Sequence, residues 1–207
     1  MGTMAESTTT AEHPDQRLAK GARSRASIAR HAADVASVEG LTGVSIGRLA
    51  TDLGISKSGI ATLFGTKEAL QVAAVQVARE AFVERVIAPS LAEARGVPRL
   101  RALMDRWFDH ITDPTFPGGC FRVATIAEFD SKPGPVRDAI AEDRRDWLAF
   151  LAKQIHQAQE AGHLRARTPE ATAFELDAVI SAANTAHQMG DSTGVTTART
   201  IVESLLA

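Results

Sequence analysis

Hydrophobic residues recur along most of the chain at spacings of three and four, and no stretch alternates as a half-buried strand would. This spacing is typical of amphipathic α-helices. Glycine, proline or capping residues separate the periodic segments, as expected for helix ends. The pattern predicts an all-α fold of about nine helices. The expected helices span residues 23–39, 45–53, 56–64, 66–89, 98–112, 120–129, 136–161, 168–189 and 195–206.

Two short helices in residues 44–63 are separated by a tight turn. Ser45 and Ser56 can cap their N-termini, and Gly54 supplies the positive φ that ends the first helix. The apolar positions that face inward are Ile46, Leu49, Ala50, Leu53, Ile60, Leu63 and Phe64. A helix, a glycine-containing turn and a second helix are typical of the DNA-binding helix-turn-helix, although a purely structural αα-hairpin has the same pattern.

The second short helix leaves a polar surface that suits DNA. Lys57 supplies a cation, Ser58 and Thr62 supply hydroxyls, and Gly59 allows close approach of the backbone. Such groups contact phosphates and base edges in the major groove. The candidate DNA-binding residues are Ser45, Ser56, Lys57, Ser58, Gly59, Thr62 and Lys67.

This segment resembles the N-terminal domain of the TetR family of transcriptional regulators. The matching residues are Ile28, Ala32, Gly40, Val44 to Ile46, Leu49, Ala50, Gly54 to Gly59, and Phe64 together with Lys67 to Leu70. Ala61 departs from the family, which usually carries an aromatic residue there, most often a tyrosine that touches a DNA phosphate. That contact is therefore expected to be missing or supplied elsewhere.

The resemblance implies a homodimer that binds a pseudo-palindromic double-stranded DNA operator and is released from it by a small-molecule effector. It implies a DNA-binding domain over residues 20–70 and a helical effector-binding and dimerisation domain over residues 71–207. Residues 1–19 are polar and without periodicity, which predicts a disordered tail. Basic residues outnumber acidic ones in residues 15–70 and the reverse holds beyond, which suits a head that approaches phosphates.

The resemblance also implies that the last two helices pair between subunits. Small residues at positions 178, 181, 182 and 186 would allow close helix approach across a dimer interface. The alternative is that these helices pack only within one subunit.

The middle of the chain is the expected effector region. It concentrates aromatic side chains and a few polar groups on apolar faces, the composition of a ligand site. Taken one at a time, however, aromatic side chains at helical spacing are also typical of an ordinary hydrophobic core. The candidate pocket residues are Trp107, Phe108, Phe121, Trp147 and Phe174, with Asn184 and His187 as polar anchors.

Cys120 is a candidate redox residue. It follows Gly118 and Gly119 and lies at an expected helix start, where the helix dipole lowers the pKa of a thiol. The alternative is a small buried apolar side chain.

Other functions find little support. A single cysteine excludes an internal disulfide, and the chain has neither a signal peptide nor a run of 18 apolar residues, so we expect a cytoplasmic bacterial protein without a membrane partner, associated with the nucleoid when bound to DNA. No zinc, nucleotide or hydrolase motif occurs, so we expect no catalytic residues, metal or cofactor. The alternative is a helical enzyme or small-molecule carrier with a structural N-terminal hairpin, which would not bind DNA.

Overall fold

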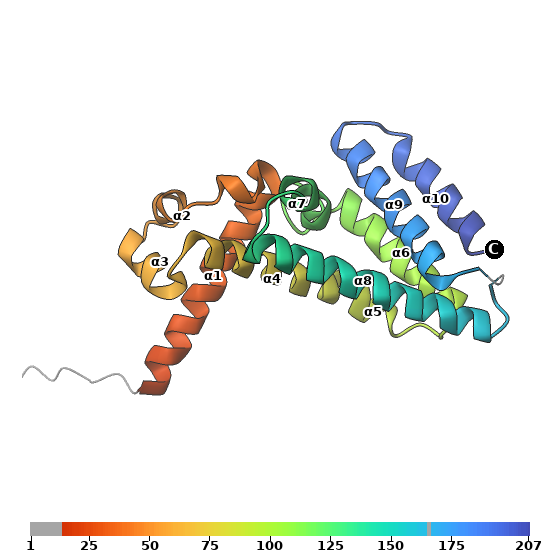
Figure 1. Ribbon diagram of the computed structural model, residues 1–207, viewed down its shortest axis with the longest axis horizontal. Coiled ribbons are helices and arrows are strands. Elements are labelled where there is room, and N and C mark those ends of the chain that lie inside the picture. Colours follow the sequence, from red (N-terminus) through yellow and green to blue (C-terminus); the bar gives the residue numbers. More distant parts are fainter. Residues whose placement is uncertain (1–13, 165–166) are drawn as a thin grey trace, which may run out of the picture.

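The computed structural model describes residues 14–164 and 167–207, and throughout this part the chain is α-helical apart from loops and one π-helical turn (Figure 1). The predicted all-α fold is confirmed. No helix within these two ranges is long and apolar enough to cross a membrane. The elements are α1 (Pro14–Gly43), α2 (Ile46–Leu53), α3 (Lys57–Phe64), α4 (Lys67–Phe82), η1 (Val83–Ile87), α5 (Ala88–Ser90), α6 (Val97–Thr112), α7 (Phe121–Phe129), α8 (Pro135–Glu160), α9 (Pro169–Gln188) and α10 (Gly194–Leu205).

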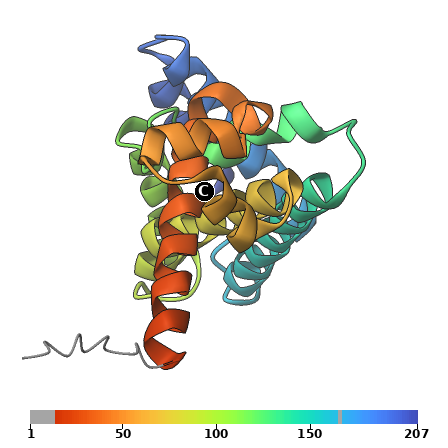
Figure 2. The same cartoon turned by 90° about the vertical axis from the view of Figure 1, so that its left-hand side faces the viewer.

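The molecule is elongated, with α2 and α3 at one end and α9 and α10 toward the other (Figure 1). Figure 2 looks onto the end formed by α1, α2 and α3. Helix α4 begins directly after α3 and continues through η1 and α5. We call α1 to α3 the head and α6 to α10 the body. Helix α4 packs against α1 in the head and against α8 in the body. The continuous helical segment α4–η1–α5 therefore connects the head to the body.

Two apolar clusters hold the fold together. The first joins α1 to α4 and also includes Phe116, Phe121 and Phe129, which belong to the body. The second fills the body around Trp107 and Trp147. Because apolar burial is the main stabilising contribution, side chains from the body stabilise the position of the head.

The predicted caps around the two short helices are confirmed. The hydroxyl of Ser45 accepts a hydrogen bond from the N–H of the third helical residue of α2 at 3.1 Å, and Ser56 does the same for α3 at 3.1 Å. Thr66 caps α4 at 3.0 Å. Gly54 ends α2 with φ 63°, the left-handed conformation that glycine adopts most readily. These bonds satisfy amide groups that a helix start leaves without partners.

Helix α1 differs from the prediction at both ends. It begins at Pro14 rather than near residue 23, so residues 14–19 are helical although the tail was expected to include them. The rest of the expected tail, residues 1–13, lies outside the described residues. Gly40 breaks the helix as expected, with φ 75° and ψ 165°, but a further helical turn follows it up to Gly43.

A carboxylate from the body binds the backbone N–H groups that follow the break at Gly40. Glu128 on α7 accepts hydrogen bonds from the N–H groups of Leu41 and Thr42, each at 2.7 Å. A Cβ at position 40 would lie 2.8 Å from the Glu128 carboxylate, so glycine is required both for its positive φ and for space. On the other side, α4 binds the freed carbonyls, with Gln71 donating to Leu41 and Lys67 to Thr42.

We predict that Glu128→Ala lowers the free energy of unfolding by about 2–3 kcal/mol, because two charge-assisted hydrogen bonds are lost and the N–H of buried Leu41 is left unpaired. Urea unfolding followed by circular dichroism measures this. Glu93→Ala, at an exposed site in the α5–α6 loop, is the control and should change stability by less than about 0.5 kcal/mol. Equal losses for the two variants would contradict the assigned role of Glu128.

Candidate nucleic-acid interface and effector grooves

Helix α3 presents a polar surface to solvent. Lys57, Ser58, Gly59 and Thr62 are all exposed, whereas Ile60 and Phe64 are buried on the opposite side. The hydroxyl of Thr62 donates to the Ser58 carbonyl at 2.8 Å. The other two candidate serines cap helices, so their side-chain oxygens already accept backbone hydrogen bonds.

Two lysines are available to phosphates at this surface. Lys57 makes no ion pair with any residue of the described chain, and it is fully exposed at the start of α3. Lys67 starts α4 and donates to the Thr42 carbonyl at 2.9 Å, which leaves its charge unneutralised. By contrast, Arg48 is neutralised by Asp52 at 2.7 Å and Glu39 at 3.2 Å. Lys57 and Lys67 are therefore better placed than Arg48 to pair with DNA.

Sequence reasoning missed Arg25, which supports α3 from α1. Its guanidinium donates to the Leu63 carbonyl at 2.5 Å and lies 4.4 Å from the centre of the Phe64 ring. A cation at a helix C-terminus is favoured by the helix dipole. The pattern of hydrophobic positions could not reveal this contact, because it joins residues 38 positions apart.

Ala61 is exposed on α3 and has no group that could reach a phosphate. Ala61 therefore cannot make the phosphate contact that an aromatic hydroxyl at this position would make.

We predict that Lys57→Ala and Lys67→Ala each weaken DNA binding about equally for all sequences, because each removes one phosphate contact. The slope of log affinity against log salt should fall by about one for each variant. Fluorescence anisotropy with labelled duplex DNA over a range of salt concentrations measures this slope. Arg95→Ala, which removes the same charge from the α5–α6 loop, should leave the slope unchanged. Unaltered slopes for both lysine variants would show that α3 and α4 do not contact phosphates.

The structure does not gather the candidate pocket residues around one cavity. Trp107, Phe108, Phe121 and Trp147 are buried in the two apolar clusters. The two tryptophan rings meet edge to face with centroids 5.1 Å apart, and Phe82 contacts both. These residues therefore form the core that the alternative interpretation described, while Trp147 also lines a groove.

A hydrogen bond joins the Asn184 side chain to the Cys120 backbone. The Asn184 side-chain oxygen accepts a hydrogen bond from the Cys120 N–H at 3.2 Å, and both residues are buried. Burial raises the pKa of the Cys120 thiol, and the amide groups at the start of α7 offset this only partly. The expectation that the helix start lowers this pKa is therefore wrong, because desolvation of the thiolate outweighs the helix dipole. His187 is half-buried three residues further along α9.

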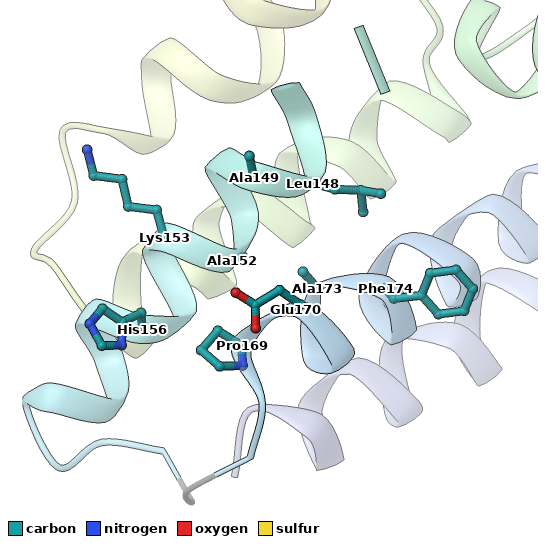
Figure 3. Close-up of a pocket in the computed structure, with 9 residues that line it drawn as sticks. All are labelled: Leu148, Ala149, Ala152, Lys153, His156, Pro169, Glu170, Ala173 and Phe174. Carbon is teal, nitrogen blue, oxygen red and sulfur yellow. The ribbon is translucent and has the colours of Figure 1, made fainter. Parts of the chain in front are cut away.

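Phe174 lies in a different place, at an open groove between α8 and α9. This groove has a volume of about 870 Å³ and is lined mainly by apolar side chains. In Figure 3, alanines and Leu148 line the facing sides of the two helices, with Lys153, His156 and Glu170 toward one end and Phe174 at the other. Phe174 is 59% exposed, so most of its surface is open to solvent in the single subunit.

A second groove lies between α4–η1 and α8, where a network of charges connects α4, α7 and α8. Arg122 on α7 binds Asp143 on α8 at 2.9 Å, and Arg79 on α4 binds Asp146 at 2.6 Å. Burial raises the pKa of the Asp143 carboxyl and lowers the pKa of Arg122, and each opposes this shift in the other. These residues were missed in the sequence, because charged residues on helices are usually solvated.

The same network continues into α9. Asp177 accepts a hydrogen bond from the Trp147 indole at 3.1 Å and pairs with Arg144 at 3.0 Å. Burial raises the pKa of the Asp177 carboxyl, while Arg144 and Arg122 lower it. Across residues 14–164 and 167–207, no group of three or more histidine, cysteine or acidic residues could hold a metal ion.

Comparison with known proteins identifies the family. A family model for the tetracycline repressor-like C-terminal domain matches residues 96–202, more than half of the chain. A TetR transcriptional regulator from Chloroflexus aurantiacus J-10-FL superimposes with a TM-score of 0.81 and 25% sequence identity, covering 90% of this chain and 95% of that one. The chain therefore belongs to the TetR family of transcriptional regulators. A comparison with curated proteins gave no match.

Two further solved structures share the fold. A TetR-family regulator from Agrobacterium tumefaciens has a TM-score of 0.77 and 22% identity, covering 89% of this chain and 99% of that one. AibR, solved in complex with isovaleryl coenzyme A and operator DNA, has a TM-score of 0.70 and 23% identity, covering 88% of this chain and 98% of that chain.

Proposed function

We propose that this chain is a homodimeric repressor whose two α3 helices bind the half-sites of a DNA operator and which a small molecule releases. The observation that carries the proposal is the exposed polar surface of α3, with Lys57 and Lys67 not neutralised by any carboxylate of the described residues. Membership of the TetR family supports it, and AibR, which shares the fold, was solved with isovaleryl coenzyme A and operator DNA bound together.

One copy of α3 is too short to select an operator alone. It contains eight residues, so only a few side chains can reach base edges. A dimer with two-fold symmetry doubles the contacts by placing two recognition helices in successive major grooves, about 34 Å apart. The operator should accordingly be a pseudo-palindrome.

Release requires the body to change the position of α3, and α4 is the element that can transmit this. Its start is bound to the broken end of α1 through Lys67 and Gln71. Its later part is bound to α8 through Arg79. A ligand that binds the body with α4 displaced, better by a few kcal/mol than the DNA-bound form, would shift the population away from DNA.

The face formed by α9 and α10 is where we place the second subunit. An exposed stripe along α9 is made mostly of small or apolar side chains, and it borders the groove that contains Phe174. The stripe consists of Ala171, Phe174, Ala178, Ala182, Thr185 and Met189. Helix α10 buries Ala198, Val202 and Leu206 within the subunit, but Ile201 on the same helix stays 42% exposed and is available to a partner. The proposed pair of interface helices is therefore the last two, α9 and α10.

We predict that Ala182→Glu disrupts the dimer, because it would bury an unpaired carboxylate between two copies of α9. Sedimentation velocity should show a monomer that keeps its helical circular dichroism. Ala92→Glu makes the same substitution at an exposed position of the α5–α6 loop and should remain a dimer. If the folded Ala182→Glu variant is still dimeric, the interface lies elsewhere.

DNA binding is tested by selecting duplexes from a random library with the wild-type protein. We expect enrichment of a pseudo-palindrome that binds at least about 1,000-fold more tightly than unrelated DNA at the same salt concentration. The double variant Lys57→Ala/Thr62→Ala should lose most of this preference. An absence of enrichment, with no DNA binding even at low salt, would favour the enzyme or carrier alternative.

A further inference from the structure

The groove between α4–η1 and α8 has the dimensions of a ligand site. It consists of two adjoining hollows of about 660 Å³ and 200 Å³, which share Arg79, Val83 and Asp143. These volumes are within or near the usual range for small-molecule sites. One wall contains the π-helical turn η1, a deviation from the α-helix that often occurs at functional sites.

The smaller hollow is lined largely by apolar and aromatic side chains. Val83 is 40% exposed at its mouth, and the Trp147 and Phe150 rings lie with centroids 6.1 Å apart. Phe150 is only half-buried, so part of its ring remains open to a ligand. This wall can therefore bind the apolar part of a small molecule.

The inner end of the groove already binds a cation of the protein itself. The Arg122 guanidinium lies 4.7 Å from the centre of the Phe82 ring and 5.4 Å from that of Trp147. It also pairs with Asp143 at 2.9 Å. Aromatic faces and a carboxylate thus stabilise a positive charge here, which is the chemistry that recognises organic cations.

The outer part of the groove carries unmatched negative charge. Glu80, Glu84 and Glu142 are exposed, and none of them forms an ion pair with the described residues. Glu80 and Glu84 lie four residues apart, a spacing at which like charges repel. In the two hollows together, five carboxylates face two guanidiniums, which leaves three unmatched negative charges. This charge attracts a cation and repels an anion.

We propose that this groove is a binding site for a small organic cation with an apolar body, such as an arylalkylammonium. The ammonium group lies between Glu84 and Glu142, and the apolar part lies against Val83 and Phe150. Binding itself does not depend on the proposed function. Only the effect of the ligand on DNA rests on the proposal that the chain is a ligand-responsive repressor.

The site also explains how such a ligand would act on α4. Arg79 binds Asp146 at 2.6 Å and approaches Asp143 to 4.0 Å, and these pairs connect α4 to α8. The Arg79 side chain is 41% exposed, so it can be displaced without opening the core. An ammonium group between Glu84 and Glu142 shares the groove with Arg79, repels its guanidinium and so weakens the connection between the two helices.

Isothermal titration calorimetry on the full-length protein without DNA tests the site. Three probes share one aromatic skeleton and differ in charge: 2-phenylethylammonium, 2-phenylethanol and phenylacetate. We expect the cation to bind in the millimolar range or tighter, and the neutral and anionic compounds to bind at least about tenfold more weakly. The double variant Glu84→Gln/Glu142→Gln should weaken binding of the cation at least about fivefold, a difference of about 1 kcal/mol. Asp138→Asn removes a charge from α8 outside the groove and should bind as wild type does.

Equal affinity for the three probes, no binding of the cation at millimolar concentration, or a double variant that binds as wild type does would each overturn the proposal. Operator release is measured separately. A cation that binds through Glu84 and Glu142 without weakening operator affinity would support the site and contradict its regulatory role. Specific operator binding that another compound releases, together with failure of the cation to bind, would support the repressor and overturn the site.

Discussion

The two hydrogen bonds from the N–H groups of Leu41 and Thr42 to Glu128 determine how the DNA-binding head is attached to the body. Gly40 breaks α1, and the break frees backbone groups that must find partners because Leu41 is fully buried. The body supplies the acceptor through Glu128, and α4 supplies the donors through Lys67 and Gln71. These polar contacts act together with the apolar cluster that joins the head to Phe116, Phe121 and Phe129 of the body in setting the position of α2 and α3.

A second connection, made by charges rather than backbone groups, holds α4 to the body. Arg122 and Asp143 are largely buried, which is costly unless they pair with each other. Arg79 is more exposed and joins α4 to the same carboxylate region. The inner pair is thus a fixed part of the core, whereas the outer pair can exchange partners. Helix α4 is held firmly at its start, and its ion pairs further along can exchange partners. It is therefore suited to transmitting a change in the body to the head.

Local features were predictable from the sequence and long-range pairings were not. Ser45, Ser56 and Thr66 cap helices as predicted, because capping involves residues only three positions apart. By contrast, Glu128 binds residues 86 and 87 positions away, and no periodicity indicates such a contact. The aromatic residues of the middle segment were correctly placed on helices. Their periodicity does not distinguish a packed core from a ligand site, and most of them form the core.

The pattern of hydrophobic positions also did not show which polar and charged side chains are buried. Cys120 is fully buried, which is the alternative that its sequence position left open, and this burial outweighs the helix start in raising the pKa of its thiol. Arg79, Arg122 and Asp143 looked like ordinary surface charges, because the sequence does not show that α4, α7 and α8 meet there. Phe174 was expected in the effector pocket and Ala182 in the subunit interface, and in the single subunit both side chains remain exposed. That exposure is what an unpaired subunit interface would leave.

The central claim is that two copies of α3 bind one operator with the spacing of a helical turn, and hydroxyl-radical footprinting on a selected duplex tests it most directly. The account predicts two protected half-sites related by a two-fold axis, with centres about 34 Å apart. Both should disappear together in the Ala182→Glu variant, because a monomer has only one α3. A single protected segment, or protection of both half-sites by a monomeric variant, would contradict the account.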